Sequence, residues 1–278
     1  MHGAAPREAA QRMPSILAIV LTHDAADALD RCLTAIERQT APPERVLVVD
    51  NASRVPAQAG ARGVSTEVVR VEENGGPAGG HAVGLARFLA STFDVAWVMD
   101  DDCIPEADCL ERLVARHDAP PGGGIVFPFW IDAATGEGSF LPAWCGFVID
   151  RTTVERLGVP RAEFVWWAED TEYLQWRVHV ADIRVEHEPD AQVEHRRVRW
   201  VTTRPVWKVY YEVRNTVFFR LYVQRKPFTR FKRMFRTLAK LFAQIVTRED
   251  HKVAKLAAYA RGLFDGLTGR LGLRMPLS

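Results

Sequence analysis

The sequence predicts an α/β protein with a parallel sheet and one ligand cleft along the ends of its strands. Short apolar runs alternate with segments whose apolar residues recur at helical spacing. Polar clusters follow several of these runs, at the point where each predicted strand ends. The carboxyl ends of parallel strands meet at one edge of a sheet, and ligands of open α/β sheets bind there. We therefore expect the functional residues to come from several strand ends together.

Length and composition restrict the class of protein. The chain has 278 residues, 47% of them hydrophobic, which suits one large domain with an appendage and disfavours disorder. A formal net charge of +1 argues against a general nucleic-acid-binding protein. The 4 cysteines form no CxxC pair, which favours a reducing cytoplasm over disulfide stapling. No apolar run approaches the ~18 residues of a membrane span.

The first half of the chain predicts strands and helices in alternation. Residues 1–14 lack an apolar core, so we interpret them as a disordered leader and not as a signal peptide. The expected strands cover residues 16–21, 46–49, 66–71 and 95–99, and the expected helices cover 29–38 and 83–89. This alternation indicates parallel pairing with right-handed crossovers.

Two polar clusters follow the second and third of these strands. Asp50-Asn51 ends the second strand, and Asn74-Gly75-Gly76 opens a glycine-rich loop after the third. Glycine permits positive φ and a close approach of the backbone to a ligand. The loop lacks the GxGxxG spacing of a dinucleotide site and the lysine of a P-loop. Each cluster has a structural alternative, since the acid and amide can cap a turn and the glycines can form a flexible one.

The strand expected at 95–99 ends in the most informative cluster, Asp100, Asp101 and Asp102. Three adjacent carboxylates repel one another unless a cation or hydrogen-bond donors offset the repulsion. Mg²⁺ and Mn²⁺ prefer such oxygen ligands and can bridge them to substrate phosphates. The alternative is a solvated acidic turn that caps a helix beginning near Pro105.

The second half of the chain is less regular. We expect strands at 125–127, 144–149, 183–186 and 191–194, a helix after Glu169-Asp170 to about residue 179, and another helix from Pro205. His195 follows the last of these strands. It is either a ligand or an ordinary strand-end histidine that pairs with Glu194 or Asp190.

The C-terminal region predicts an amphipathic basic helix. Apolar residues recur at intervals of three and four from Phe228 to Ile245, and arginines and lysines occupy the opposite arc. Such a helix can lie in the interface of an anionic membrane, where each basic residue gains about 1 kcal/mol. Alternatively, its apolar stripe packs on the rest of the protein, and a second helix over 252–267 pairs with it.

Residues 16 to about 220 resemble the family 2 glycosyltransferases, which are inverting enzymes with a GT-A fold. The order and spacing of six segments carry the resemblance: Val20-Leu21-Thr22, Val48-Val49-Asp50-Asn51-Ala52-Ser53, Asn74-Gly75-Gly76, Asp100-Asp101-Asp102, Glu169-Asp170 and His195. The triple acid, the loop 75–80 and the segment 210–215 look most like bacterial galactofuranosyl- and rhamnosyltransferases. The resemblance implies a GT-A domain over 15–222, a Rossmann-like nucleotide-binding sheet flanked by helices, and a helical tail over 223–278.

The resemblance also implies roles for the donor and metal residues. The donor-binding residues would be Thr22, Asp50, Asn51, Asn74, Gly75, Gly76, Asp100 and Asp101, with Asp50 near the base of the nucleotide. Asp102 and His195 would hold a divalent cofactor, Mn²⁺ or Mg²⁺, on the donor diphosphate. The chemistry is consistent with this, because a divalent ion offsets the negative charge that develops on a departing diphosphate. His23-Asp24 departs from the family, which more often has an aromatic residue and asparagine there, then arginine.

Glu169 and Asp170 are the candidate catalytic residues, and the resemblance implies that Asp170 is the general base. An acceptor hydroxyl loses a proton as it attacks, and a positioned carboxylate that takes it contributes typically ~10²–10⁴-fold. Spacing alone leaves open which of the two acids is the base. Trp166 and Trp167 would bind the acceptor sugar, or they belong to the core. The structural alternative for the acid pair is stabilisation of a helix N-terminus.

The predicted function is inverting transfer of a sugar from a nucleotide-diphosphate sugar, of the UDP-galactofuranose or dTDP-rhamnose type. The acceptor would be a hydroxyl of a glycan or a lipid-linked glycan in cell-envelope polysaccharide synthesis. The expected location is the cytoplasm or, peripherally, the inner face of the cell membrane. A nucleotidyltransferase that makes nucleotide-sugars is disfavoured, because its glycine-rich N-terminal loop with a lysine is missing. Intact Asp102, Asp170 and His195 argue against a non-catalytic sugar-binding protein.

Overall fold

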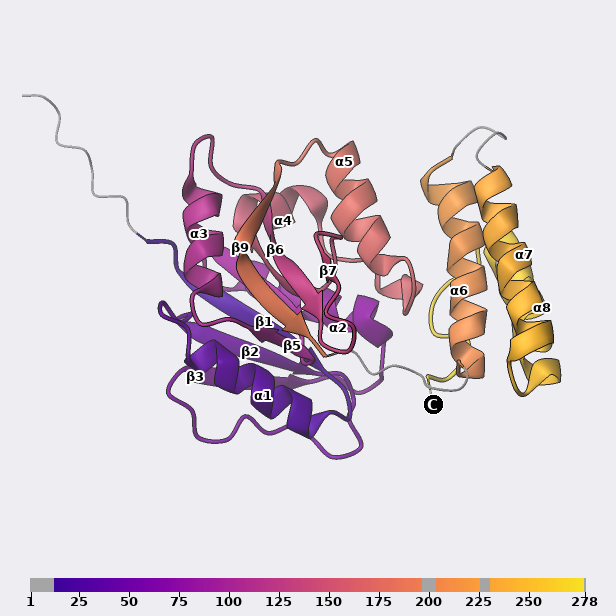
Figure 1. The fold of residues 1–278 in the computed structure, drawn as a ribbon, viewed down its shortest axis with the longest axis horizontal. Helices are drawn as coiled ribbons and strands as arrows, with labels where there is room; N and C mark the ends of the chain where they lie inside the picture. The colour runs from indigo at the N-terminus through magenta and orange to yellow at the C-terminus, as the bar shows by residue number, and fades with distance from the viewer. Residues whose placement is uncertain (1–12, 197–203, 226–230, 278) are drawn as a thin grey trace, which may run out of the picture.

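The computed structural model describes residues 13–196, 204–225 and 231–277, in which one curled sheet lies beside three long helices (Figure 1). The strands are β1 (Ile16–Thr22), β2 (Arg45–Asp50), β3 (Ser65–Arg70), β4 (Val95–Asp100), β5 (Cys103–Pro105), β6 (Ile125–Asp132), β7 (Gly138–Ser139), β8 (Cys145–Asp150) and β9 (Val185–His195). The α-helices are α1 (Ala26–Glu37), α2 (Gly76–Ala90), α3 (Cys109–Asp118), α4 (Arg151–Leu157), α5 (Val178–Val180), α6 (Val206–Phe218), α7 (Phe231–Arg248) and α8 (Lys252–Leu267). Shorter turns are η1 (Ala162–Phe164) and the π-helices η2 (Thr171–Arg177) and η3 (Phe219–Val223). Most of the predicted leader, residues 1–14, lies outside the described residues.

The α/β class and the parallel first half are confirmed. The sheet order is β3-β2-β1-β4-β8-β6-β9-β5, with β7 beside β6, and its first four strands are parallel. Thr22 pairs with Asp50, and Leu21 pairs with Asp100. This register brings the polar residues after β1, β2 and β4 to one edge of the sheet.

The expectation of a parallel sheet is wrong for much of the second half, where, of the described strands, only β9 pairs in parallel, with β6. β8 runs antiparallel to both β4 and β6, and β5 runs antiparallel to β9. The segment between β6 and β8, residues 133–144, contains no helix, and a connection without a crossover favours antiparallel pairing. The strands expected at 183–186 and 191–194 are one strand, β9, whose pairing with β6 shifts register next to Pro128.

The three acids do not cap a helix at Pro105. Residues 103–105 form the short strand β5, and α3 begins only at Cys109. The alternative of a helix-capping turn is therefore wrong in its geometry. The chain instead continues in the sheet, which keeps the acids fixed between two strands.

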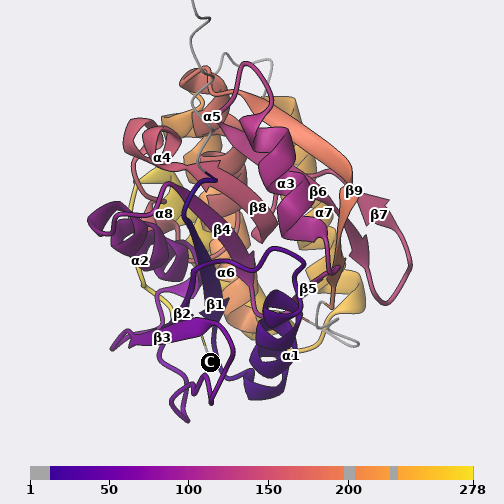
Figure 2. The ribbon, with the colours of Figure 1, turned by 90° about the vertical axis from the view of Figure 1, so that its left-hand side faces the viewer.

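Apolar layers cover both faces of the sheet, and this explains the uninterrupted apolar runs of β1, β2 and β4. Trp97 lies within one layer with no exposed surface, and its Nε1 donates to the Gly146 carbonyl at 2.9 Å. The curled sheet and its covering helices lie in front of α6 and α8 when the molecule is turned (Figure 2).

The C-terminal helices pack on α6. In α7 the buried residues are Met234, Leu238, Leu241 and Ile245, which share an apolar cluster with Val209, Val213 and Val217 of α6. Two glycines of α8 lie against the α6 backbone, because a Cβ on Gly262 or Gly266 would stand 2.7 Å from a carbonyl oxygen of α6. The predicted alternative, in which the apolar stripe of this helix packs on the rest of the protein, is therefore confirmed for these four residues of α7. Phe235 and Phe242 of the same stripe remain exposed. Among the described helices, none combines the length and the apolarity that crossing a bilayer requires.

Candidate active site

A cleft of about 360 Å³ lies at the carboxyl ends of the parallel strands. Its lining brings together most of the predicted donor and metal residues with parts of α6 and the C-terminal segment: Leu21, Thr22, His23, Asn51, Asn74, Gly76, Pro77, Asp100, Asp101, Asp102, Trp166, Trp207, Lys208 and Leu277. Asp50, Gly75 and His195 are absent from this lining. The strand-end cleft expected from the sequence thus exists.

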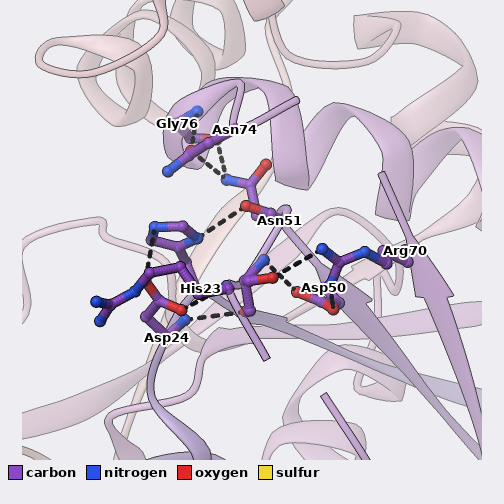
Figure 3. A network of polar contacts seen from close by, with 9 residues as sticks. His23, Asp24, Asp50, Asn51, Arg70, Asn74 and Gly76 are labelled. Atoms are coloured by element: carbon purple, nitrogen blue, oxygen red, sulfur yellow. Dashed lines mark hydrogen bonds and ion pairs between the residues drawn. The ribbon is translucent and has the colours of Figure 1, made fainter. Parts of the chain in front are cut away.

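Asn51 fixes the glycine-rich loop to the end of β2 (Figure 3). Its amide nitrogen donates to the side-chain oxygen of Asn74 and to the Gly76 carbonyl, both at 3.0 Å, and its side-chain oxygen accepts from the Gly75 N–H. The Asn51 carbonyl lies 2.9 Å from Nδ1 of His23. The two strand ends and the loop therefore form one connected polar floor, and Gly75 acts there through its backbone.

Asp50 lies beneath that floor with no exposed surface. Its oxygens accept from the Ser53 and Ala57 N–H groups and from Arg70, whose Nη1 lies at 2.7 Å (Figure 3). Burial opposes ionisation, but these donors outweigh it and lower the pKa of Asp50. Its predicted contact with the base of a nucleotide stays a prediction, and its visible role is to hold the turn after β2.

The close approach at Gly76 is to the protein itself. The residue has φ +66°, and a Cβ there would stand 2.1 Å from the Val165 carbonyl oxygen. This glycine lets the loop lie against the segment that leads to Glu169 and Asp170. The glycine-rich loop and the segment that carries the two acids meet at this contact.

The three acids at the end of β4 have different environments. Burial, then the charge of Asp102, raises the pKa of Asp100 well above its usual range. Burial also raises the pKa of Asp101 to about 7, against the effect of a hydrogen bond with Thr22. A bound cation would stabilise the ionised form of these carboxyl groups, because it would offset both their mutual repulsion and their lost hydration.

His81 of α2 holds Asp100 from behind. The ring has no exposed surface, stacks on Trp144 at 4.0 Å, and places Nε2 2.9 Å from Asp100 Oδ1. Burial lowers the pKa of His81 to about 3, so the ring is neutral. Nδ1 is buried with no hydrogen-bond partner among the described residues, and an unpaired acceptor costs less than an unpaired N–H. We therefore assign the Nε2–H tautomer, which donates to Asp100.

Asp102 and His195 form the predicted metal pair. Their strands are neighbours, because Cys103 of β5 pairs with His195 of β9. His195 Nε2 lies 3.2 Å from Asp102 Oδ1, and both side chains are partly exposed. A carboxylate and a neutral imidazole at this separation fit two adjacent positions around a divalent ion, so the donor set suits the cofactor that the sequence predicts.

The segment before the candidate base is strained. Val165, Trp167 and Ala168 all have positive φ, between +63° and +75°, which side chains other than glycine rarely adopt. Such strain is stable only when the surroundings impose it, and it clusters at functional sites. The segment presents Glu169 and Asp170 at the start of η2.

Two buried residues of α6 impose that conformation. The Asn215 amide nitrogen lies 2.8–2.9 Å from the carbonyl oxygens of Phe164, Trp166 and Trp167. The Arg214 guanidinium donates to the carbonyls of Glu163 and Phe164 at 3.0 and 2.8 Å. Neither side chain has exposed surface. These two positions hold the acid-bearing segment by its backbone.

Glu169 and Asp170 differ in exposure and partners. Glu169 is buried, its Oε2 has no hydrogen-bond partner among the described residues, and burial, then the charge of Asp170, raises its pKa well above normal. Asp170 is partly exposed and accepts from the N–H and the hydroxyl of Thr171. Burial raises the pKa of Asp170 against those hydrogen bonds. Asp170 is therefore the acid that is both accessible and poised to take a proton.

A second pocket of about 360 Å³ adjoins these acids. Its lining combines the strained segment with α6, η3 and α7: Trp166, Trp167, Ala168, Glu169, Asp170, Thr171, Thr216, Phe219, Arg220, Met234 and Thr237. Trp166 also lines the donor cleft, so the two pockets share a wall. Trp167 is 39% exposed there, as a surface for sugar stacking needs.

Sequence reasoning missed His81, Lys208 and the structural role of Asn215. Lys208 lies over the rings of Trp166 and Trp207, at 4.8 and 5.3 Å, and burial lowers its pKa. Lys208 precedes Tyr211 by three residues and Asn215 by seven, so helical spacing alone could have predicted that it lies on the same side of α6. His81 stands within a glycine-rich run, where nothing marks its partner.

The chain is similar in sequence to known glycosyltransferases. The family model described as glycosyl transferase family 2 matches residues 17–144. The chain is 33% identical to galactofuranosyltransferase GlfT1 of Mycolicibacterium smegmatis in a match of 180 residues, and the match covers 52% of this chain and 59% of that protein. It is 35% identical to GlfT1 of Mycobacterium tuberculosis H37Rv over 92 residues, 32% of this chain and 30% of the relative. The chain thus spans less than two thirds of these relatives.

Solved structures show the same fold. The mannosyltransferase PcManGT from Pyrobaculum calidifontis, in complex with GDP-Man and Mn²⁺, matches 93% of this chain and 76% of its own, with TM-score 0.54 and 18% identity. GalNAc-T7 with UDP, GalNAc and Mn²⁺ matches 76% of this chain and 49% of its own, with TM-score 0.57 and 14% identity. These likenesses confirm the predicted GT-A fold.

Proposed function

We propose that this chain belongs to glycosyl transferase family 2 and transfers a sugar from a nucleotide-diphosphate sugar to an acceptor hydroxyl with inversion. The observation that carries the proposal is the shared wall between two pockets. One contains the three acids of β4 with His195 beside them, and the other contains Asp170. A donor in the first pocket and an acceptor in the second would meet at Trp166.

Different residues of the donor pocket bind the nucleoside, the metal ion and the leaving group. Asn51, Asn74 and the loop at Gly76 form the floor for the nucleoside. Asp102 and His195 would hold a divalent ion, Mn²⁺ or Mg²⁺, which when bound neutralises charge on the diphosphate. Lys208 lines the same cleft and adds a positive charge toward the leaving group.

Asp170 takes the proton of the attacking hydroxyl. It is partly exposed in the acceptor pocket, and its backbone is fixed by the strained segment that Asn215 holds. A raised pKa brings the carboxylate closer to the operating pH, at which a general base is most effective. Glu169 is buried, its pKa is raised by that burial and by the charge of Asp170, and it does not face the acceptor as openly.

The donor we favour is a UDP-galactofuranose or dTDP-rhamnose type of sugar nucleotide, with a hydroxyl of a cell-envelope glycan or glycolipid as acceptor. The relatives named galactofuranosyltransferase support the first. The residues of α7 that line the acceptor pocket lie close to the exposed Phe235 and the basic arc of that helix. This proximity supports a lipid-linked acceptor at an anionic membrane surface.

A panel of nucleotide-sugars with Mn²⁺ tests the proposal. A ligand that binds only the folded state raises the unfolding midpoint, so the true donor should stabilise the protein most, and only with the metal present. The selected donor should then support metal-dependent transfer to a glycan acceptor. Stabilisation by nucleoside triphosphates with release of pyrophosphate would instead indicate a nucleotidyltransferase.

A further inference from the structure

We propose that Asp102, Cys103, Cys145 and His195 form a site for a thiophilic divalent ion such as Zn²⁺. This site shares Asp102 and His195 with the proposed Mn²⁺ or Mg²⁺ site, so the two ions exclude each other. The binding of Zn²⁺ is independent of the enzyme's activity, whereas its inhibitory consequence rests on the proposed function.

Three of the four side chains, Cys103, Cys145 and His195, are already clustered, and Asp102 lies beside two of them. Cys103 Sγ lies 3.2 Å from Cys145 Sγ and 3.8 Å from Asp102 Oδ1, and His195 Nε2 lies 3.2 Å from that same oxygen. One ligand atom from each of Cys103, Cys145 and His195 lies within 4.8 Å of the others. Tetrahedral zinc, with bonds of about 2.0–2.3 Å, separates its ligand atoms by about 3.3–3.8 Å. Side-chain rotations that draw the three clustered ligands together and turn Asp102 toward them would complete the site.

The sheet, and not a flexible loop, supplies these ligands. Cys103 and His195 face each other across the β5–β9 pair, and Cys145 begins β8 at the irregularity where it pairs with Met99 of β4. The His195 ring meets Trp130 edge-on at 5.6 Å, which restricts its orientation. A site on fixed strands needs little reorganisation when an ion enters.

The chemistry of the ligands selects the ion. Thiolate and imidazole ligands suit Zn²⁺, whereas Mg²⁺ and Mn²⁺ prefer oxygen ligands. Both cysteines are free and buried, with 0% and 2% exposure, while Asp102 and His195 are partly exposed and Asp102 lines the cleft. An ion would therefore enter through the pair at the cleft, and two S–H protons would leave to solvent as the two sulfur–metal bonds form.

Occupation of this site would remove the anchor of the donor's metal. Asp102 and His195 would turn toward the sulfur atoms and no longer hold an ion against a diphosphate. Zn²⁺ should thus inhibit transfer in competition with Mn²⁺, and a chelator that prefers Zn²⁺ should restore activity.

Co²⁺ provides a readout that needs no donor, because its bonds to thiolates give an intense near-ultraviolet charge-transfer band. The full-length protein titrated with Co²⁺ should show this band, and Zn²⁺ should abolish it by displacement. Cys145→Ala should weaken the band and lower Co²⁺ affinity by at least about tenfold, the scale on which metal sites respond to lost support. Cys103→Ser should do the same, which guards against a folding defect in either variant.

Cys109→Ala is the matched control, since Cys109 is a buried free cysteine outside the cluster. It should keep the band. A wild-type protein without the band, or a Cys145→Ala protein with an unchanged spectrum, would overturn the site even if the protein proves to be an active transferase. If the band is present and no sugar donor is ever transferred, the zinc site stands and the proposed function fails.

Discussion

The donor pocket and the acceptor pocket are built in different ways. The donor pocket stands on the ends of parallel strands, and its polar residues are linked to near neighbours in the sheet, as Asn51 is to Asn74 and Gly76. The acceptor pocket stands on a strained segment whose conformation depends on hydrogen bonds from α6, about fifty positions later in the chain. We therefore expect donor-side changes to alter binding and acceptor-side changes to alter turnover.

The two pockets should also differ in how well they tolerate the loss of a side chain. Strand ends in a sheet buried on both faces keep their geometry when one polar side chain is lost. A segment with three positive φ values relaxes when its external support is removed. The acceptor side is accordingly the more sensitive to residues that never touch a substrate.

The largest expected effect is on the donor side. Asp102→Ala should remove Mn²⁺-dependent nucleotide binding and lower transfer at least about 10³-fold, because metal stabilisation of developing charge is worth several kcal/mol. Calorimetry of nucleotide binding with and without Mn²⁺, beside a transfer assay, checks this. Full activity of Asp102→Ala in the presence of a chelator would refute the metal assignment.

Asp170→Asn should affect turnover and leave donor binding intact, the opposite of a change in the donor pocket. It keeps shape and hydrogen-bonding reach but removes basicity, so turnover should fall about 10²-fold or more while donor affinity stays near normal. Glu169→Gln is the matched control and should be milder, because Glu169 is the buried member of the pair. An inactive Glu169→Gln protein beside a fully active Asp170→Asn protein would reverse the two roles.

Asn215→Ala sharpens the comparison, because Asn215 touches neither proposed substrate. The carbonyls of Trp166 and Trp167 would lose the Asn215 donor and that of Phe164 would keep Arg214, which should cost about 1–3 kcal/mol of unfolding free energy. Turnover should fall more than donor affinity, and Asn51→Ala should raise donor KM more than it lowers kcat. Equal shifts of kcat and KM in both variants would remove the proposed distinction between the pockets.

The sequence predicted the donor side better than the acceptor side, for a physical reason. Apolar runs with polar ends are local signals, and the strands at 16–22, 45–50, 65–70 and 95–100 followed from them almost residue by residue. The antiparallel pairing of β8 and the continuity of β9 depend on contacts between distant segments, and both predictions failed there.

The same reason separates the site residues. Glu169 and Asp170 were visible as an acid pair, but the positive φ values before them and the anchoring by Asn215 are properties of the folded chain. Burial of Asp50 also follows from its partner Arg70 on the neighbouring strand. The residue types in the sequence indicated which side chains could be functional. Which of their atoms are accessible depends on contacts between distant segments, which the sequence does not show.

His81 tests how far donor-side geometry depends on a residue that the sequence did not mark. His81→Phe keeps an aromatic ring over Trp144 but removes the hydrogen bond to Asp100, and the lost interaction of about 1–3 kcal/mol should weaken donor binding by roughly 5- to 150-fold. His81→Gln can place its amide nitrogen near the position of Nε2 and should recover part of the affinity. Identical donor affinity in His81→Phe and wild type would show that Asp100 needs no such support.

The smallest effect should come from the exposed face of α7, which touches neither pocket directly. Phe235 and Phe242 are 59% and 46% exposed, and exposed Arg233, Arg236 and Lys240 flank them. Burial of such an aromatic side chain in an interface is worth about 1.5–3 kcal/mol, so Phe235→Ala with Phe242→Ala should weaken binding to anionic vesicles about tenfold or more.

Phe264→Ala, on an exposed position of α8, is the matched control and should change little. Transfer to a water-soluble acceptor should be unaffected, because the α7 residues that line the acceptor pocket are Met234 and Thr237. If the wild-type protein ignores anionic vesicles, or if neutral vesicles bind it equally well, the aromatic and basic face of α7 is not a membrane surface.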